Sequence, residues 1–254
     1  MEIKEYMKIL WFTWKDQTHP FAGGAEVVTS EICKRLVADG HEIIMLAGGY
    51  GECKKNDMID GYTVIRIGGQ FSIYWKAHRY YMKHLIGWAD VIIEEANIVP
   101  FFTQYYVKEK KRYVIYHQLG RKVWLYQIFF PLNVIGYLIE PFYTYLLRKN
   151  TVITVSESTK KDLQRFGFDE SKIHIISEGV NIDRMEQIEK TKKITEPILL
   201  SFGNVRAMKR TGHIIRAFEI AKKDASFTFG DRWRHTQCIW NADGATSQEI
   251  TVCF

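Results

Sequence analysis

The sequence contains few cysteines and none of the short motifs that mark the common nucleotide-binding and hydrolase folds. Its 4 cysteines lie far apart without a C-x-x-C pair. This argues against a disulfide framework or a zinc site and indicates a reduced, cytoplasmic chain. The absence of G-x-G-x-x-G argues against a nicotinamide or flavin enzyme, and Walker and G-x-S-x-G motifs are missing as well. The N-terminus is charged and lacks the apolar stretch of a signal peptide.

The excess of positive charge is small. The chain has 35 Lys+Arg against 29 Asp+Glu, a formal net charge of +6. This balance is compatible with a phosphate-bearing ligand or an anionic membrane face, and it gives no indication of nucleic acid as a partner. Hydrophobic residues at 46% and charged residues at 25% exclude a mainly disordered chain. The 254 residues exceed one domain of about 150 and fall short of two.

Strand and helix patterns alternate along most of the chain. We expect strands at residues 7–13, 42–47, 62–67, 90–94, 112–117, 151–155 and 172–176, and helices at 25–39 and 72–88. Near-continuous apolar strands separated by helices predict an α/β, Rossmann-like parallel sheet with helices on both faces. Ligands of such sheets bind beyond the carboxyl ends of the strands. The loops after Thr13, Glu94, His117 and Val155 should therefore share one edge.

Four segments follow from changes in pattern. We expect residues 1–180 to form the Rossmann-like domain, and the polar stretch 181–196 is predicted to be a linker. Residues 197–224 begin a second α/β domain with one strand and one helix, which cannot bury a core alone. Residues 225–254 form an atypical tail without sustained periodicity. Two interpretations of this tail remain: an irregular extension, or the product of a frameshift or artificial junction.

Two loops at the predicted ligand edge carry candidate binding residues. Gly23 and Gly24 lead directly into a helix, where a backbone without side chains and a helix N-terminus suit a phosphate. A plain strand-to-helix turn is the alternative. His117 ends a strand and is placed to hydrogen-bond a substrate hydroxyl or carbonyl, or else to serve the fold. Glu94 and Glu95 end the preceding strand, but adjacent strand residues point to opposite faces.

Residues 123–147 form the most unusual segment. Glu140 is the only formal charge over 25 residues, and basic residues flank both ends. The length permits a membrane span, but internal Pro, Gly and Glu disfavour one. Tyr and Trp suit a membrane interface. Protein core, a membrane-surface or lipid-acceptor face, and a spanning helix are the three interpretations.

Basic residues also follow the strand of the second unit. Gly203, Arg206, Lys209 and Arg210 stand just after that strand and before the next helix. Cations beside a helix N-terminus suit a diphosphate, and a solvated basic helix start is the alternative.

Taken together, these pieces resemble the retaining glycosyltransferases of family 4, which have the GT-B fold. The matching features are the glycine loop 23–26, YHQLG around His117, VITVSESTKKDL at 152–163, the linker HIISEGVNIDR at 174–184, and the second-domain opening 198–223. The resemblance covers roughly residues 7–223. It implies that residues 1–180 are the acceptor-side domain and that the second domain holds the donor.

The resemblance also implies the chemistry. A sugar passes from a nucleotide-sugar to an acceptor with retention, without a cofactor or a bound metal. Gly23 and Gly24 would lie near the donor phosphates, His117 would contact the transferred sugar, and Lys209 would neutralise the leaving diphosphate. We expect the acceptor to be a sugar or a lipid-linked group. The apolar segment 123–147 with its basic flanks favours peripheral membrane contact at the cytoplasmic face.

Two departures from the family pattern bear on activity. Asn204 stands where the family usually has Arg, and Arg206 is close enough to substitute for it. The family's E-x7-E element does not occur after Lys209. We therefore expect a truncated donor domain that lacks about 100 or more residues. A non-catalytic carbohydrate- or partner-binding remnant is the alternative function, and a nucleotide-sugar epimerase is a third.

Overall fold

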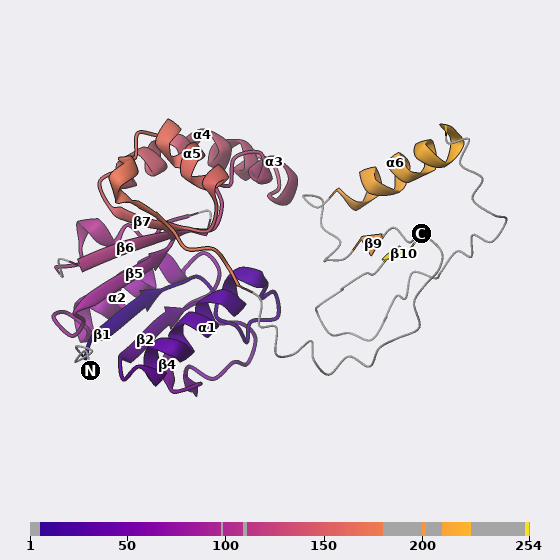
Figure 1. Cartoon of the computed structure of the whole chain (residues 1–254). Coiled ribbons are helices and arrows are strands. Elements are labelled where there is room, and N and C mark those ends of the chain that lie inside the picture. The colour runs from indigo at the N-terminus through magenta and orange to yellow at the C-terminus, as the bar shows by residue number, and fades with distance from the viewer. Residues whose placement is uncertain are drawn as a thin grey trace. The chain divides into compact units, whose positions relative to one another are not determined.

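The computed structural model of the chain describes residues 6–97, 99–108, 111–179, 200–201, 210–224 and 252–253 (Figure 1). It divides into two compact units. The first comprises Met1–Leu125 and Phe129–Gly179, and the second comprises Tyr126–Ile128 and Val180–Phe254.

The first unit is built on an eight-stranded sheet. Its strands are β1 (Lys8–Phe12), β2 (Glu42–Ala47), β3 (Asn56–Ile59), β4 (Tyr62–Arg66), β5 (Val91–Glu95), β6 (Lys111–Tyr116), β7 (Thr151–Thr154) and β8 (Ile173–Ile175). Their order is β3-β4-β2-β1-β5-β6-β7-β8, and every neighbouring pair is parallel except β3–β4. This confirms the predicted Rossmann-like sheet.

The antiparallel edge strand β3 was not predicted. It lacks an apolar run, and it pairs with β4 through a tight turn at Asp60-Gly61. Both turn residues have positive φ, 45° and 89°. An Asp-Gly pair at such a turn is a recognised hairpin signal, so the sequence did contain the information.

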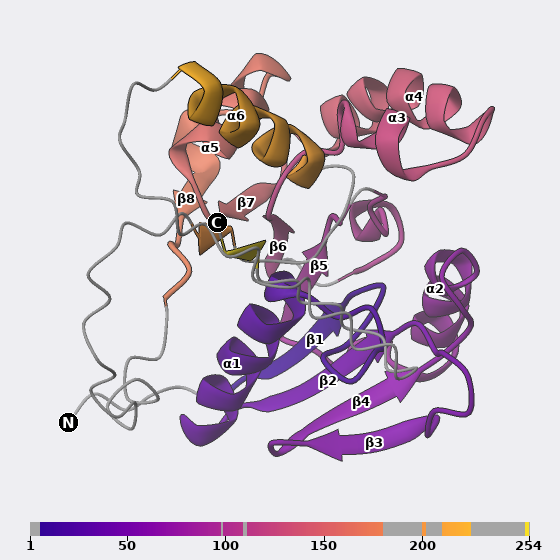
Figure 2. The same cartoon turned by 90° about the vertical axis from the view of Figure 1, so that its right-hand side faces the viewer.

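Helices cover both faces of the sheet, as predicted. They are α1 (Gly24–Ala38), α2 (Ile73–His84), α3 (Val123–Gln127), α4 (Leu132–Leu147) and α5 (Glu157–Arg165), with short 3₁₀ turns at Thr103–Tyr105 and Glu170–Lys172. Side chains of β1 alternate between the two faces. Trp11 packs in one core with Cys33 of α1, whereas Phe12 packs in the other with Tyr81 of α2. Figure 2 shows α1 lying over β1 and β2.

The connections reverse direction at the centre of the sheet. From β1 the chain builds β2 and β4 on one side, and it then returns to place β5 on the other side of β1. In open α/β sheets, ligands bind outside the carboxyl ends of the strands at this switch point. The topology therefore assigns the candidate site to the carboxyl ends of β1 and β5 and to the loops beside them.

The second unit contains β9 (Leu200–Ser201), α6 (Thr211–Asp224) and β10 (Val252–Cys253). β10 pairs antiparallel with β9. The one helix predicted within residues 197–224 is present as α6. Gly203, Arg206 and Lys209 lie outside the described residues.

Candidate functional site

A buried glutamate joins the elements at the switch point. Glu95 ends β5 and is 1% exposed. Its Oε1 accepts hydrogen bonds from Trp11 Nε1 at 2.7 Å and Thr29 Oγ1 at 2.5 Å, and its Oε2 accepts from Thr13 Oγ1 at 2.8 Å and Asn97 Nδ2 at 3.1 Å. Burial raises the pKa of Glu95, and the hydrogen bonds from Thr29, Thr13 and Trp11 act to lower it. The carboxyl group thus fixes β1, α1 and β5 relative to one another.

The neighbouring Glu94 points to the opposite face, as strand geometry predicts. Its oxygens accept hydrogen bonds from the backbone N–H groups of Phe102 at 2.8 Å and Thr103 at 3.0 Å, and from Thr103 Oγ1 at 2.5 Å. It therefore holds the 3₁₀ turn after β5. The two carboxyl groups serve different loops and do not form an acid/base pair.

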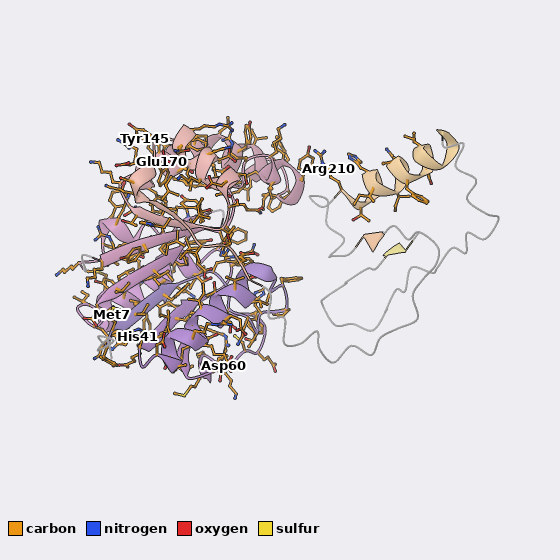
Figure 3. All side chains as sticks on the ribbon, in the orientation of Figure 1. Met7, His41, Asp60, Tyr145, Glu170 and Arg210 are labelled. Carbon is orange, nitrogen blue, oxygen red and sulfur yellow. The ribbon has the colours of Figure 1, made fainter. Side chains whose placement is uncertain are left out.

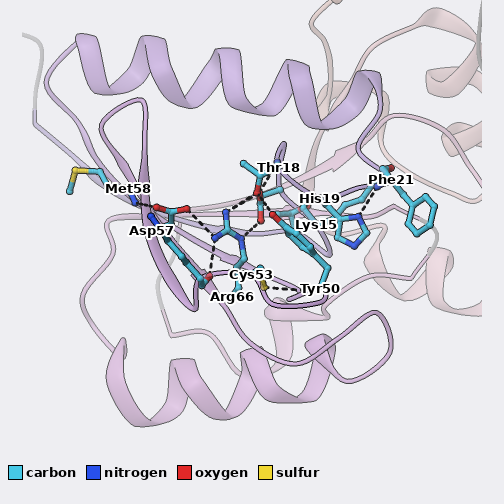
Figure 4. A network of polar contacts seen from close by, with 12 residues as sticks. Lys15, Thr18, His19, Phe21, Tyr50, Cys53, Asp57, Met58 and Arg66 are labelled. Atoms are coloured by element: carbon cyan, nitrogen blue, oxygen red, sulfur yellow. Dashed lines mark hydrogen bonds and ion pairs between the residues drawn. The ribbon is translucent and has the colours of Figure 1, made fainter. Parts of the chain in front are cut away.

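A buried ion pair between Arg66 and Asp16 holds the loop from Trp14 to Gly23. Figure 4 shows the network of polar contacts around Arg66. Arg66 Nε, at the end of β4, lies 2.7 Å from Asp16 Oδ2, and its Nη2 donates to Asp16 Oδ1 at 3.2 Å and Thr18 Oγ1 at 2.9 Å. Burial acts to raise the pKa of Asp16, but hydrogen bonds from Arg66 and Thr18 hold it below its ordinary value.

A second buried pair fixes the end of the same loop. Lys15 Nζ lies 3.3 Å from Glu26 Oε1 and also donates to the carbonyl of Phe21. Glu26 Oε2 accepts from the backbone N–H of Gly23 at 2.6 Å, which closes the start of α1. The loop that leads into α1 is thus held by ion pairs and hydrogen bonds to Arg66 of β4 and Glu26 of α1.

Neither predicted binding glycine is required by the fold around it. Gly23 has φ −139°, which other residues adopt readily. Apart from the adjoining residues and the backbone of α1 itself, no described atom lies within 4 Å of where a Cβ on Gly24 would stand. Beyond its chain neighbours, the nearest described atom to a Cβ on Gly23 is Glu26 Oε2 at 3.6 Å. Glycine at an open helix start leaves room for a ligand to approach the backbone.

His117 follows β6 at the same edge of the sheet. Its Nδ1 lies 3.1 Å from Glu178 Oε1, beyond β8. Its Nε2 is buried and has no hydrogen-bond partner among the described residues. Ser156 caps α5, accepting from the N–H of Thr159 at 3.3 Å.

The loop after His117 is held by the only charge of the apolar segment. Glu140 of α4 is 1% exposed, and it accepts hydrogen bonds from the N–H groups of Gly120 at 2.6 Å and Arg121 at 2.5 Å. Burial raises the pKa of Glu140. The indole of Trp124 lies so close to α4 that a Cβ on Gly136 would stand 2.1 Å from it. Glu140 and Gly136 thus fit α3 and the loop before it against α4.

The opposite side of α4 is apolar and exposed. We call this surface the outer apolar face; its members are Leu125, Phe129, Phe130, Leu132, Val134, Ile135, Leu138, Ile139, Phe142 and Tyr145, each at least 39% exposed. Tyr145 is labelled in Figure 3. Apolar patches of this kind mark interaction surfaces. No helix among the described residues is both long enough and apolar enough to cross a membrane.

The structure therefore brings three of the predicted site residues, Gly23, Gly24 and His117, to the carboxyl edge of one sheet. Sequence reasoning missed the residues that support them: Lys15, Asp16, Glu26, Arg66 and Glu178. The available signal was weak. Charged residues directly after a buried strand and at the end of another indicate a polar network at that edge, but they do not show which residues pair.

Comparisons with known proteins agree with this geometry. A sequence model of the family described as Glycosyltransferase Family 4 matches residues 22–184. Sucrose-phosphate synthase from Thermosynechococcus elongatus is 15% identical with a TM-score of 0.53, the match covering 69% of this chain and 49% of that one. A glycosyltransferase from Rickettsia africae ESF-5 is 19% identical with a TM-score of 0.52, covering 74% and 47%. A comparison with curated protein sequences returns no match.

The likeness to these structures is one of fold, and the chain spans about half the length of each. The family match covers more than half of the chain and includes Gly23, Gly24, His117 and Glu178. The chain belongs to the glycosyltransferase family that this model describes, and its first unit has the architecture of the N-terminal half of a GT-B glycosyltransferase.

Proposed function

We propose that this chain takes part in transferring a sugar from a nucleotide-sugar donor to an acceptor, with retention of the anomeric configuration. The supporting observation is that one edge of the sheet offers open space beside a helix N-terminus and a buried histidine nitrogen without a described hydrogen-bond partner. Gly24 opens α1, and no described atom beyond the adjoining residues and the backbone of α1 lies within 4 Å of its Cβ position. His117 Nε2 lies buried without a described hydrogen-bond partner. Both stand at the carboxyl edge of a sheet whose switch point is fixed by Glu95.

The roles of these residues follow from their chemistry. The backbone at Gly23 and Gly24 approaches the donor phosphates, since helix N–H groups favour anions. His117 contacts the transferred sugar as the catalytic residue. Arg206 and Lys209 neutralise the leaving diphosphate, which is the charge that develops during transfer.

The outer apolar face suggests what the acceptor is. Basic residues stand before it at Arg121 and Lys122 and after it at Arg148 and Lys149. An exposed apolar helix face with basic flanks is suited to the interface of an anionic membrane. We therefore propose a lipid-linked acceptor that is reached from the cytoplasmic leaflet.

Donor binding tests the proposal directly. We would titrate the full chain with UDP-glucose, GDP-mannose and ADP-glucose by calorimetry and repeat the titration with Gly24→Val. Valine is a better helix former than glycine, so stability should stay equal or rise, while the side chain occupies the space that the phosphates need. Affinity should fall at least about tenfold if one phosphate contact is lost, since charged hydrogen bonds contribute about 1.5–3 kcal/mol.

Gly69→Val provides the matched control. A Cβ on Gly69 also meets nothing within 4 Å, and its φ is not positive. Its affinity should equal that of the wild type. Equal affinity in Gly24→Val, or no binding of any of the three donors by the wild type, would contradict the proposed donor site.

A further inference from the structure

The two nitrogen atoms of His117 have different surroundings. Nδ1 faces Glu178 Oε1 at 3.1 Å, and the two side chains are 13% and 39% exposed. Nε2 is buried and meets no hydrogen-bond partner in the described part of the chain. The parallel order β6-β7-β8 brings these residues, 61 positions apart, to the same edge of the sheet.

This geometry determines where the proton of the neutral ring lies. A carboxylate only accepts hydrogen bonds, so Nδ1 must carry the proton that it donates to Glu178. In that tautomer Nε2 has a free lone pair and accepts a hydrogen bond. Buried polar atoms are nearly always hydrogen-bonded, so an unpartnered acceptor at a ligand edge indicates a donor that arrives with the ligand.

The neighbouring carboxyl group does not supply that donor. Both oxygens of Glu95 already accept hydrogen bonds, from Trp11 and Thr29 at Oε1 and from Thr13 and Asn97 at Oε2.

A histidine at the other edge of the sheet provides a contrast. His41, labelled in Figure 3, accepts at Nδ1 from the backbone N–H of Met7 at 3.3 Å, beside the start of β1. That ring serves the backbone, whereas the Nδ1 partner of His117 is a side chain and its Nε2 has no described partner.

We propose that Glu178 is a positioning residue for His117. It holds the ring proton on Nδ1, so that Nε2 accepts a hydrogen bond from a hydroxyl of the bound sugar. The identity of that hydroxyl as one of the donor sugar rests on the proposed function. Glu178 stands two residues before Val180, where the second unit resumes. Its carboxylate therefore links the start of the connection to the sugar-contacting ring.

The tautomer itself is the first test, and it does not depend on activity. Long-range ¹H–¹⁵N correlation on the full chain, labelled with ¹⁵N-histidine, distinguishes the two neutral tautomers and the doubly protonated ring. The His117 signals are assigned by their loss in His117→Gln, among 8 histidines. We expect Nδ1–H in the wild type. An Nε2–H or a doubly protonated ring at neutral pH would overturn the proposal.

Substitutions at Glu178 separate positioning from folding. Glu178→Ala should shift His117 toward the Nε2–H tautomer, whereas Glu178→Gln should keep Nδ1–H because its amide oxygen still accepts. Glu52→Ala, which changes an exposed glutamate on another loop, is the control and should leave the spectrum unchanged. An unchanged His117 tautomer in Glu178→Ala would refute the role of Glu178.

Ligand binding then tests the hydroxyl contact. Glu178→Ala should weaken UDP-glucose binding about two- to twelvefold, the value of one neutral hydrogen bond, and leave UDP binding unchanged. Equal affinity for UDP-glucose in the variant and the wild type would overturn the contact. Failure of the wild type to bind any nucleotide-sugar would contradict the proposed function, whereas the NMR result decides the positioning independently.

Discussion

The buried Arg66–Asp16 pair gives the sharpest prediction about how the candidate site is held. We would replace Arg66 with methionine, which has a similar length but no charge. The Arg66 side chain is 2% exposed and that of Asp16 is fully buried. Besides Asp16, the guanidinium donates to Thr18 Oγ1 at 2.9 Å, to the carbonyl of Lys54 at 2.9 Å and to the partly exposed Asp57 Oδ2 at 3.3 Å. Arg66→Met therefore leaves a buried carboxylate without its main partner.

The loss of unfolding free energy expected for Arg66→Met follows from the unpaired charge left on buried Asp16. Removing one partner of a buried ion pair costs about 3–5 kcal/mol of unfolding free energy. For a unit of this size, 1 kcal/mol shifts Tm by about 2–4 °C, so Tm should fall by about 6–20 °C. The double variant Asp16→Leu/Arg66→Met removes both charges. Its loss should be smaller than the sum of the two single losses, because neither charge is left buried alone.

The pKa shift of Asp16 determines how the stabilisation by this ion pair changes with pH. Burial acts to raise the pKa of Asp16, but hydrogen bonds from Arg66 and Thr18 lower it below its ordinary value. Such a carboxyl stabilises the fold above its unfolded pKa, near 3.8, and this contribution is lost as pH falls through the folded value. The stability gap between the wild type and Arg66→Met should therefore narrow in acid.

Urea unfolding followed by tryptophan fluorescence between pH 3 and pH 7 measures these quantities. The cycle of the two single variants and the double variant at pH 7 separates the loss of the ion pair from the effect of changing the side-chain volumes at positions 16 and 66. A loss under 1 kcal/mol in Arg66→Met, or additive losses in the double variant, would refute the view that this pair holds the loop before α1.

Two further substitutions test the apolar segment. Gly136→Ala should destabilise the fold by about 1–3 kcal/mol through overpacking, because its Cβ would stand 2.1 Å from the Trp124 ring. Thermal unfolding measures this loss, and a Tm above that of the wild type would contradict the close packing of Trp124 on α4. Leu138→Ser/Phe142→Ser should weaken sedimentation with anionic liposomes at low salt at least about tenfold, since burying each side chain, 66% and 65% exposed, contributes about 1–2 kcal/mol. Phe71→Ser, at a site 74% exposed on another loop, should leave sedimentation unchanged; failure of the wild type to sediment would contradict membrane contact.

The sequence by itself determined the architecture of the sheet and the edge at which we propose that a ligand binds. Continuous apolar strands and helical spacing define which faces are buried, and parallel strands place their carboxyl ends together. The positions of Gly23, Gly24 and His117 at this edge could be predicted because each residue lies at the boundary of a periodic segment. Glu94 and Glu95 were assigned to opposite faces for the same reason. The edge strand β3 was missed although its Asp60-Gly61 turn was visible.

Only the tertiary structure decided which residues support that edge. Asp16 and Arg66 are 50 positions apart, and His117 and Glu178 are 61 apart. Pairing over such distances depends on strand order, which periodicity does not encode. The same holds for α4, whose sequence is apolar all round. Only its packing shows that the side of α4 bearing Glu140 is buried and that the side bearing Phe142 is exposed. The local sequence pattern shows that a helix has an apolar surface, but contacts with residues distant in sequence determine which part of that surface is covered.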